Sequence, residues 1–136
     1  AIPADRMEAC PYEGGHDARW VIGHIAVGLD FAGTLLGLGP GVPSEWGKLF
    51  GPGASGRTDP KGPSKRELVD VLNRLHASIS AAMRKADPEA MAKPHGLAFL
   101  PSDSPLVTVG DFISYLVTTH SFYHLAQLSA CKTVSK

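Results

Sequence analysis

The sequence predicts an all-α protein, because three long segments have helical periodicity and no segment has a convincing strand pattern. The chain has 136 residues, enough for one domain with a core but not for two. Apolar residues make up 43% of it, which is typical of a chain that folds. We therefore expect residues 1–136 to form a single domain built as a helical bundle.

The first long helix is predicted at about residues 17–36. Asp17 is a residue type that favours the N-cap of a helix. Gly37 and Pro40 follow the last apolar residues, and this order is a common signal for a helix end. Residues 1–15 precede the helix and read as a loop with at most one or two helical turns.

Residues 20–39 are apolar enough to raise the question of a membrane span. His24 and Asp30 interrupt this run, however, and no basic cluster flanks it. We therefore expect a buried helix of the bundle and no membrane partner.

A long connection rich in glycine and proline is predicted at residues 38–63. Its first half carries Trp46, Leu49 and Phe50, which we expect to pack onto the bundle. Its second half, from residue 51, is expected to be mobile.

The second long helix is predicted at about residues 64–86. Ser64 and Glu67 have the spacing of a capping box, in which each side chain bonds the other's free backbone N–H group. Apolar residues then recur at three- and four-residue spacing, which predicts one buried stripe on a charged helix. The stripe consists of Leu68, Val71, Leu72, Leu75, Ile79, Ala82, Met83 and Ala86.

The third long helix is predicted at about residues 108–131, with Thr108 and Asp111 as a second pair of capping residues. Its inward stripe mixes apolar residues with two histidines and a glutamine. The stripe consists of Phe112, Ile113, Leu116, Val117, His120, Tyr123, His124, Gln127, Leu128 and Cys131.

Charge and cysteine content exclude several classes of function. The 13 basic residues equal the 13 acidic residues in number, so the chain has no electrostatic footprint for nucleic acid or an anionic membrane. Cys10 and Cys131 fit no metal or redox spacing. A disulfide between them stays open, but a reduced, cytoplasmic protein is the simpler interpretation.

His120 and His124 lie four residues apart, so the two imidazoles share one helix face about one turn apart. Both fall in the apolar stripe and therefore point into the bundle. A buried imidazole without a partner is costly, and a shared cation would satisfy both. His24 lies among apolar residues of the first helix and is the best candidate for a third ligand.

Three neutral imidazoles suit zinc, nickel, cobalt, copper or iron(II) rather than magnesium or calcium. They also leave a coordination position free for water or substrate, as in catalytic sites. The alternative is a hydrogen-bonded polar pocket without a metal. Glu45 and Asp30 are the acidic residues considered as a general base, although the sequence does not place them near the ligands.

Other candidate residues have both structural and functional interpretations. Trp20, Trp46 and Phe50 could form the core or line a substrate pocket, and Gln127 could be a structural hydrogen-bonding group or an outer partner of a ligand. The remaining histidines read as surface residues, with the first of them a reserve ligand: His16, His76 and His95.

Two segments resemble stretches of the DinB/YfiT-like family of metalloenzymes. Residues 20–26, WVIGHIA, are similar to a stretch that contains a tryptophan and a histidine, and residues 120–128, HSFYHLAQL, are similar to its H-x-x-x-H-x-x-Q-L ending. Trp46 and Phe50 in the long connection also fit. The resemblance extends from about residue 3 to residue 131.

The resemblance implies an up-up-down-down four-helix bundle in which His24, His120 and His124 bind one divalent metal, most often zinc, nickel or iron. Relatives include thiol-dependent transferases and isomerases, and dimers are usual. The resemblance therefore implies a small-molecule substrate, a low-molecular-weight thiol as co-substrate, and a homodimer. The family's first helix should precede the loop at residues 1–15; an upstream segment, a second chain or an unusual fold of residues 1–13 would take its place.

Two functions follow from these expectations. One is a metal-dependent hydrolase or a thiol S-transferase or isomerase. The other is a non-catalytic stress-response bundle that binds a metal or a small molecule. Whether the protein is an enzyme stays open at the level of sequence, because related scaffolds host different chemistries.

Overall fold

The computed structural model describes residues 1–58 and 62–135. Throughout these ranges the chain is helical or irregular, with a lone β-bridge between Pro94 and Thr108 and no strand. The all-α class is therefore confirmed. The elements in chain order are η1 (Ala4–Arg6), α1 (Ala18–Leu35), α2 (Trp46–Phe50), α3 (Lys65–Met83), α4 (Pro88–Met91), α5 (Val109–Tyr115), η2 (Leu116–His120) and α6 (Ser121–Val134).

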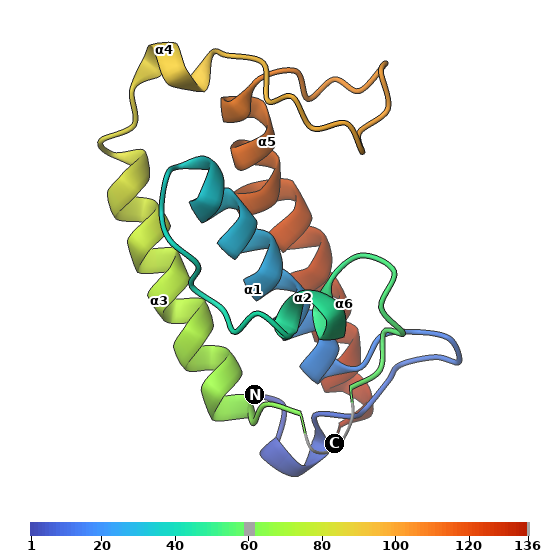
Figure 1. Ribbon diagram of the computed structural model, residues 1–136. Helices are drawn as coiled ribbons and strands as arrows, with labels where there is room; N and C mark the ends of the chain where they lie inside the picture. The colour runs from blue at the N-terminus through green and yellow to red at the C-terminus, as the bar shows by residue number, and fades with distance from the viewer. Residues whose placement is uncertain (59–61, 136) are drawn as a thin grey trace.

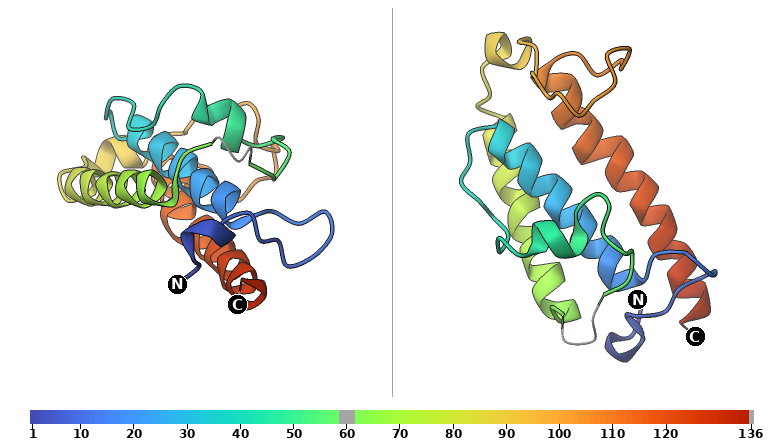
Figure 2. Two further views of the ribbon diagram at one scale, coloured as in Figure 1. Left: turned by 90° about the horizontal axis from the view of Figure 1, so that it is seen from below. Right: turned by 45° about the vertical axis from the view of Figure 1, so that its right-hand side comes forward.

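Helix α1 lies between the two other long helical rods (Figures 1 and 2). It runs parallel to α3, and in the segment that connects the two, residues 36–58 cross one face of α1. The continuous rod of α5, η2 and α6 returns antiparallel to both. Because α1 packs against both α3 and α6, it supplies more buried core residues than any other element.

The start of α1 is fixed by Asp17, which is the N-cap as predicted. One carboxylate oxygen accepts a hydrogen bond from the backbone N–H of Trp20 at 2.7 Å. The other accepts one from the backbone N–H of Thr58, also at 2.7 Å. Asp17 is almost fully buried. One side chain therefore both caps the start of α1 and anchors the connecting segment at Thr58.

The capping box of α3 is confirmed, with Ser64 and Glu67 bonding each other's backbone N–H groups. The buried stripe that packs toward α1 consists of Leu68, Val71, Leu75 and Ile79. The predicted burial of Met83 is wrong, because this residue is 41% exposed and lines a groove.

The last helical rod is longer and less regular than the sequence indicates. The Thr108–Asp111 capping box is confirmed, but the rod continues to Val134 and contains one π-helical turn, η2. Tyr123 was expected to face inward and is instead 63% exposed. The extra residue in the π turn shifts the inward face, so a plain helical pattern misplaces this side chain.

The connecting segment packs onto α1 through α2, where Trp46 and Phe50 are buried as expected. Leu49 is 40% exposed, so its predicted packing is wrong. The expectation of a mobile second half falls partly on residues 59–61, which lie outside the described residues. Within the described part of this half, Gly56 and Thr58 are hydrogen-bonded to Asp17.

An apolar groove of about 600 Å³ runs between α3 and α6, with Ile25 and Leu29 of α1 at its floor. Phe122 on its α6 side is 70% exposed. The N-terminal segment forms only the short turn η1 and does not line this groove. Over the part of the chain that the structure describes, no helix has the length and apolarity needed to cross a membrane.

The close approach of Phe50 to α1 depends on Gly23. A Cβ atom added to Gly23 would lie 2.5 Å from the Phe50 ring, which is fully buried and cannot retreat. Gly23→Ala is therefore expected to destabilise the protein by about 1–3 kcal/mol, as overpacking does. Urea unfolding followed by circular dichroism measures the change.

The matched control is Gly33→Ala in the same helix, where a new Cβ would meet its neighbours at 3.6 Å or more. Replacing a helical glycine by alanine should there be neutral or stabilising by about 0.5–1 kcal/mol. Equal effects of the two substitutions would contradict the tight contact.

Candidate metal centre

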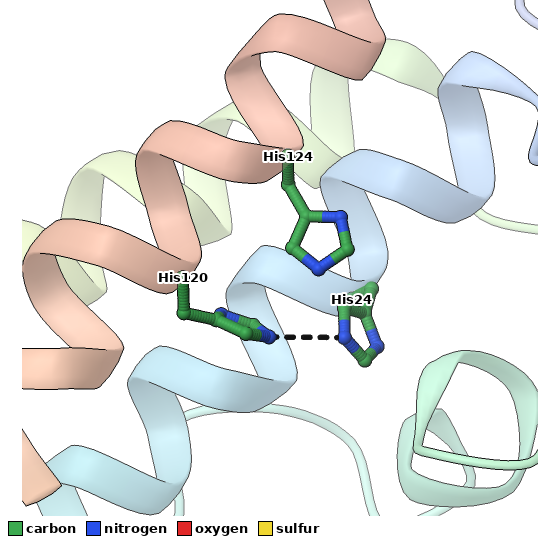
Figure 3. A group of neighbouring side chains, drawn as sticks. All are labelled: His24, His120 and His124. Carbon is green, nitrogen blue, oxygen red and sulfur yellow. Dashed lines mark hydrogen bonds between the residues drawn. The ribbon is translucent and has the colours of Figure 1, made fainter.

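The structure brings His24, His120 and His124 together between α1 and the last helical rod (Figure 3). One ring nitrogen from each of the three lies within 4.8 Å of those of the others. His24 and His120 are partly buried, and His124 is 5% exposed. The cluster that the sequence suggested is therefore one compact group of three imidazoles.

His24 is oriented by the connecting segment. Its Nδ1 lies 2.5 Å from the backbone carbonyl oxygen of Phe50. A carbonyl oxygen can only accept a hydrogen bond, so Nδ1 must carry the proton. In the neutral ring, the lone pair then belongs to Nε2, which faces His120.

His120 meets His24 through the Nε2 atoms of both rings, 3.1 Å apart (Figure 3). Two lone pairs at this distance repel, so either one nitrogen carries a proton or a cation lies beside both. The Nδ1 atom of His120 is buried and has no hydrogen-bond partner among the described residues. Gly28 leaves the space for this ring, since a Cβ there would lie 3.2 Å from its Cε1.

The π turn η2 ends at His120 and sets the rotation of this side chain. It adds a residue to one turn of an otherwise α-helical rod. Ser121 stabilises the turn, because its hydroxyl donates a 2.8 Å hydrogen bond to the carbonyl of Leu116. Such turns often occur at functional sites, but no pattern in the sequence marked this one.

His124 is oriented by Gln127, one turn further along α6. The Nδ1 atom of His124 lies 2.6 Å from the side-chain oxygen of Gln127. This oxygen accepts the proton of Nδ1, which leaves the lone pair on Nε2. Gln127 therefore holds the proton of His124 on Nδ1, as the Phe50 carbonyl does for His24.

Trp20 forms one wall of the cluster. Its ring stacks on that of His24, with ring centroids 4.5 Å apart and planes 13° apart. The ring of His16 contacts it at a centroid distance of 4.0 Å, with the planes tilted by 37°. Phe50 contributes its carbonyl oxygen, while its ring packs against Trp46 at 5.4 Å. Trp46 thus supports Phe50 rather than the imidazoles themselves.

The other histidines lie elsewhere. His76 is exposed on α3, as expected, and lines the groove. His95 was expected at the surface but is partly buried, with its ring bonded to the carbonyl of Leu106 at 2.7 Å. His16 was also expected at the surface, but it is partly buried against Trp20.

Neither acidic candidate for a general base is placed to act on the cluster. The carboxylate of Asp30 accepts a hydrogen bond from the backbone N–H of Gly41 at 2.5 Å, which fixes the connection after α1. Glu45 is exposed and precedes α2.

Burial lowers the pKa of all three clustered histidines below the ordinary value. For His120 burial and then the charges of His124 and His24 lower the pKa to about 4. Burial also outweighs the opposing hydrogen bonds to Phe50 and Gln127 in lowering the pKa of His24 and of His124. The three rings are therefore neutral near pH 7, the state in which an imidazole binds a metal.

The donor set fits a divalent transition metal. Three neutral imidazoles are the ligands such ions take, and His24 and His124 each have an outer hydrogen-bond partner on the nitrogen away from the cluster. Mutual repulsion of lone pairs is relieved when a cation lies between them. Three protein ligands also leave room for a further one.

The chain is thus an all-helical protein in which three converging histidines form a group that could hold a metal ion. Residues 1–128 match the family model of the DinB superfamily. Because this match covers most of the chain, the protein belongs to the DinB superfamily, as its two histidine segments suggested. No curated protein and no solved structure matches the chain significantly.

The lowered pKa of His120 predicts that the metal-free protein loses stability in acid. The unfolded chain takes up a proton below about pH 6.5, whereas folded His120 does so only near pH 4. The free energy of unfolding should therefore fall by about 1–2 kcal/mol between pH 7 and pH 5 on account of this group. Urea titration in the presence of a chelator, carried out at each pH, measures this change in the free energy of unfolding.

His120→Gln removes this titrating group while keeping a polar side chain of similar length. The difference in the free energy of unfolding between the parent protein and this variant should then change between pH 7 and pH 5. A difference that stays constant from pH 7 to pH 5 would contradict the buried, neutral state of His120.

Proposed function

We propose that His24, His120 and His124 bind one divalent transition metal, and that the protein is a metal-dependent hydrolase or thiol S-transferase or isomerase. The observation that carries this proposal is the 3.1 Å approach of two Nε2 atoms, with the third imidazole beside them. Membership of the DinB superfamily supports it. Zinc, nickel and iron(II) are the metals that suit the donor set best.

The side chains around the cluster have separate tasks in this proposal. The Phe50 carbonyl and Gln127 hold the Nδ1 protons of His24 and His124, so that both Nε2 atoms stay available as ligands. Trp20 covers the face of His24 and keeps water from that side. When bound, the metal would act as a Lewis acid and lower the pKa of a coordinated water or thiol.

The proposed substrate class is inferred from the family rather than from the geometry of the site. Thiol-dependent chemistry is what the likeness to this family suggests, and a small organic molecule would be the second substrate. Since neither Asp30 nor Glu45 is placed as a base, proton transfer would rely on the lowered pKa of the nucleophile. The homodimer and the cytoplasmic location stay predictions.

Metal titration tests the site itself. The chelator-treated protein should bind one zinc ion per chain, and His24→Ala, His120→Ala or His124→Ala should weaken binding by at least about 100-fold, since each removes a ligand. Gln127→Leu should weaken it by about 10- to 100-fold, because the outer partner of His124 is lost. Isothermal titration calorimetry and elemental analysis measure both effects.

His76→Ala is the matched control, because this histidine is exposed and lines the groove away from the cluster. It should bind zinc as the parent protein does. Equal binding by the parent and by the three ligand variants would contradict the proposed site.

The enzymatic part needs a separate experiment. The metal-loaded protein is incubated with a panel of low-molecular-weight thiols and electrophiles, and with simple ester and amide substrates. Turnover that His124→Ala abolishes supports an enzyme. Stoichiometric metal binding without turnover would instead favour the non-catalytic stress-response bundle.

A further inference from the structure

The two cysteine thiols lie against neighbouring residues of the same loop, although 120 positions separate Cys10 from Cys131 in the sequence. The Sγ atom of Cys10 donates a hydrogen bond to the carbonyl of Tyr12 at 3.0 Å. The same Sγ would lie 3.0 Å from a Cβ atom built on Gly15. The Cys10 thiol therefore lies against residues 12–15, in the loop before α1.

Cys131 contacts the same loop at the next residue, His16. It lies on α6 with its side chain fully buried, and its Sγ is 3.6 Å from the carbonyl oxygen of His16. Gly15 and His16 are consecutive, so both thiols lie beside one short stretch of backbone. Burial and, next, the charge of Cys10 raise the pKa of Cys131, which is consistent with this proximity.

The rest of the N-terminal segment is held at the same end of the molecule. Figure 2 shows this segment beside the C-terminal end of α6. The Arg6 side chain donates to the carbonyl of Val134 at 3.4 Å, and the carbonyl of Met7 accepts from the backbone N–H of Arg19 at 3.0 Å. The segment that carries Cys10 is therefore held at the end of the molecule where Cys131 lies.

We propose that Cys10 and Cys131 form an intramolecular disulfide when the protein meets a peroxide, and that low-molecular-weight thiols reverse it. Nothing in the metal centre requires these thiols, so this redox site is separate from the proposed function. It reinterprets a pair of cysteines whose sequence spacing fits no redox motif.

The reaction balances with the peroxide as the only oxidant. Cys10 is the more accessible thiol. Its thiolate attacks a peroxide oxygen, the O–O bond breaks, and a sulfenic acid and hydroxide form. The Cys131 sulfur then attacks the Cys10 sulfur, the S–O bond breaks and water leaves. In total two thiols lose two electrons and two protons, and hydrogen peroxide becomes two waters. Two equivalents of a small thiol reverse the bond and become its disulfide.

The position of the bond has a structural consequence. His16 lies in the stretch beside the two thiols, and its ring contacts that of Trp20 at a tilt of 37°, while Trp20 stacks on His24. A disulfide would therefore tie to α6 the loop that supports one wall of the histidine cluster.

Mass spectrometry of the intact protein tests the proposal. The full chain is treated with hydrogen peroxide, denatured and alkylated. The expected product has lost the mass of two hydrogen atoms, takes up no alkylating agent, and regains two alkylatable thiols after dithiothreitol. Digestion without reductant should yield one linked pair of peptides containing Cys10 and Cys131.

Cys10→Ser and Cys131→Ala are the matched variants, each of which removes one thiol and keeps a small side chain. After the same treatment, Cys131 in the first variant should still be alkylated, whereas Cys10 in the second should be oxidised beyond the thiol. The proposal is overturned if the parent chain forms dimers linked through Cys10, or if Cys10 is overoxidised while Cys131 stays a free thiol. Circular dichroism of each variant confirms that it is folded.

Discussion

The contact between the imidazole of His24 and the carbonyl of Phe50 links the fold to the site. It joins the central helix α1 to the segment that crosses it, at 2.5 Å. It also keeps the proton on Nδ1, so the lone pair belongs to Nε2, the atom that faces His120. The contact in turn needs Gly23, because only a residue without a Cβ lets the Phe50 ring lie so close to the helix. Local backbone packing is thus what makes His24 a candidate ligand.

The second half of the cluster is built by different means. His120 owes its rotation to the π turn η2, and His124 owes the orientation of its ring to Gln127. Burial then keeps the three rings neutral, since placing a charge there is costly. A structure that orients two imidazoles from outside and lets three nitrogens converge has the features of a metal site whose ligands are set before binding.

Several features could be predicted from the sequence because their signals are local. Asp17, Ser64 and Thr108 have recognisable capping patterns, and the spacing of His120 and His124 places both on one face. Other features depend on contacts between distant residues and leave no local pattern. The hydrogen bond from His24 to the carbonyl of Phe50, the contact of His16 with Trp20 and the exposure of Tyr123 beyond the π turn are of this kind. Tertiary packing decides them, and periodicity alone cannot.

X-ray absorption spectroscopy of the zinc-loaded protein tests the central claim most directly, because it reports the atoms bound to the metal. The three-histidine site predicts a zinc ion with three imidazole nitrogens at about 2.0–2.1 Å and a water or other non-imidazole ligand completing the shell. His24→Ala should reduce the imidazole contribution from three rings to two. A spectrum without imidazole scattering, or one that His24→Ala leaves unchanged, would contradict the account.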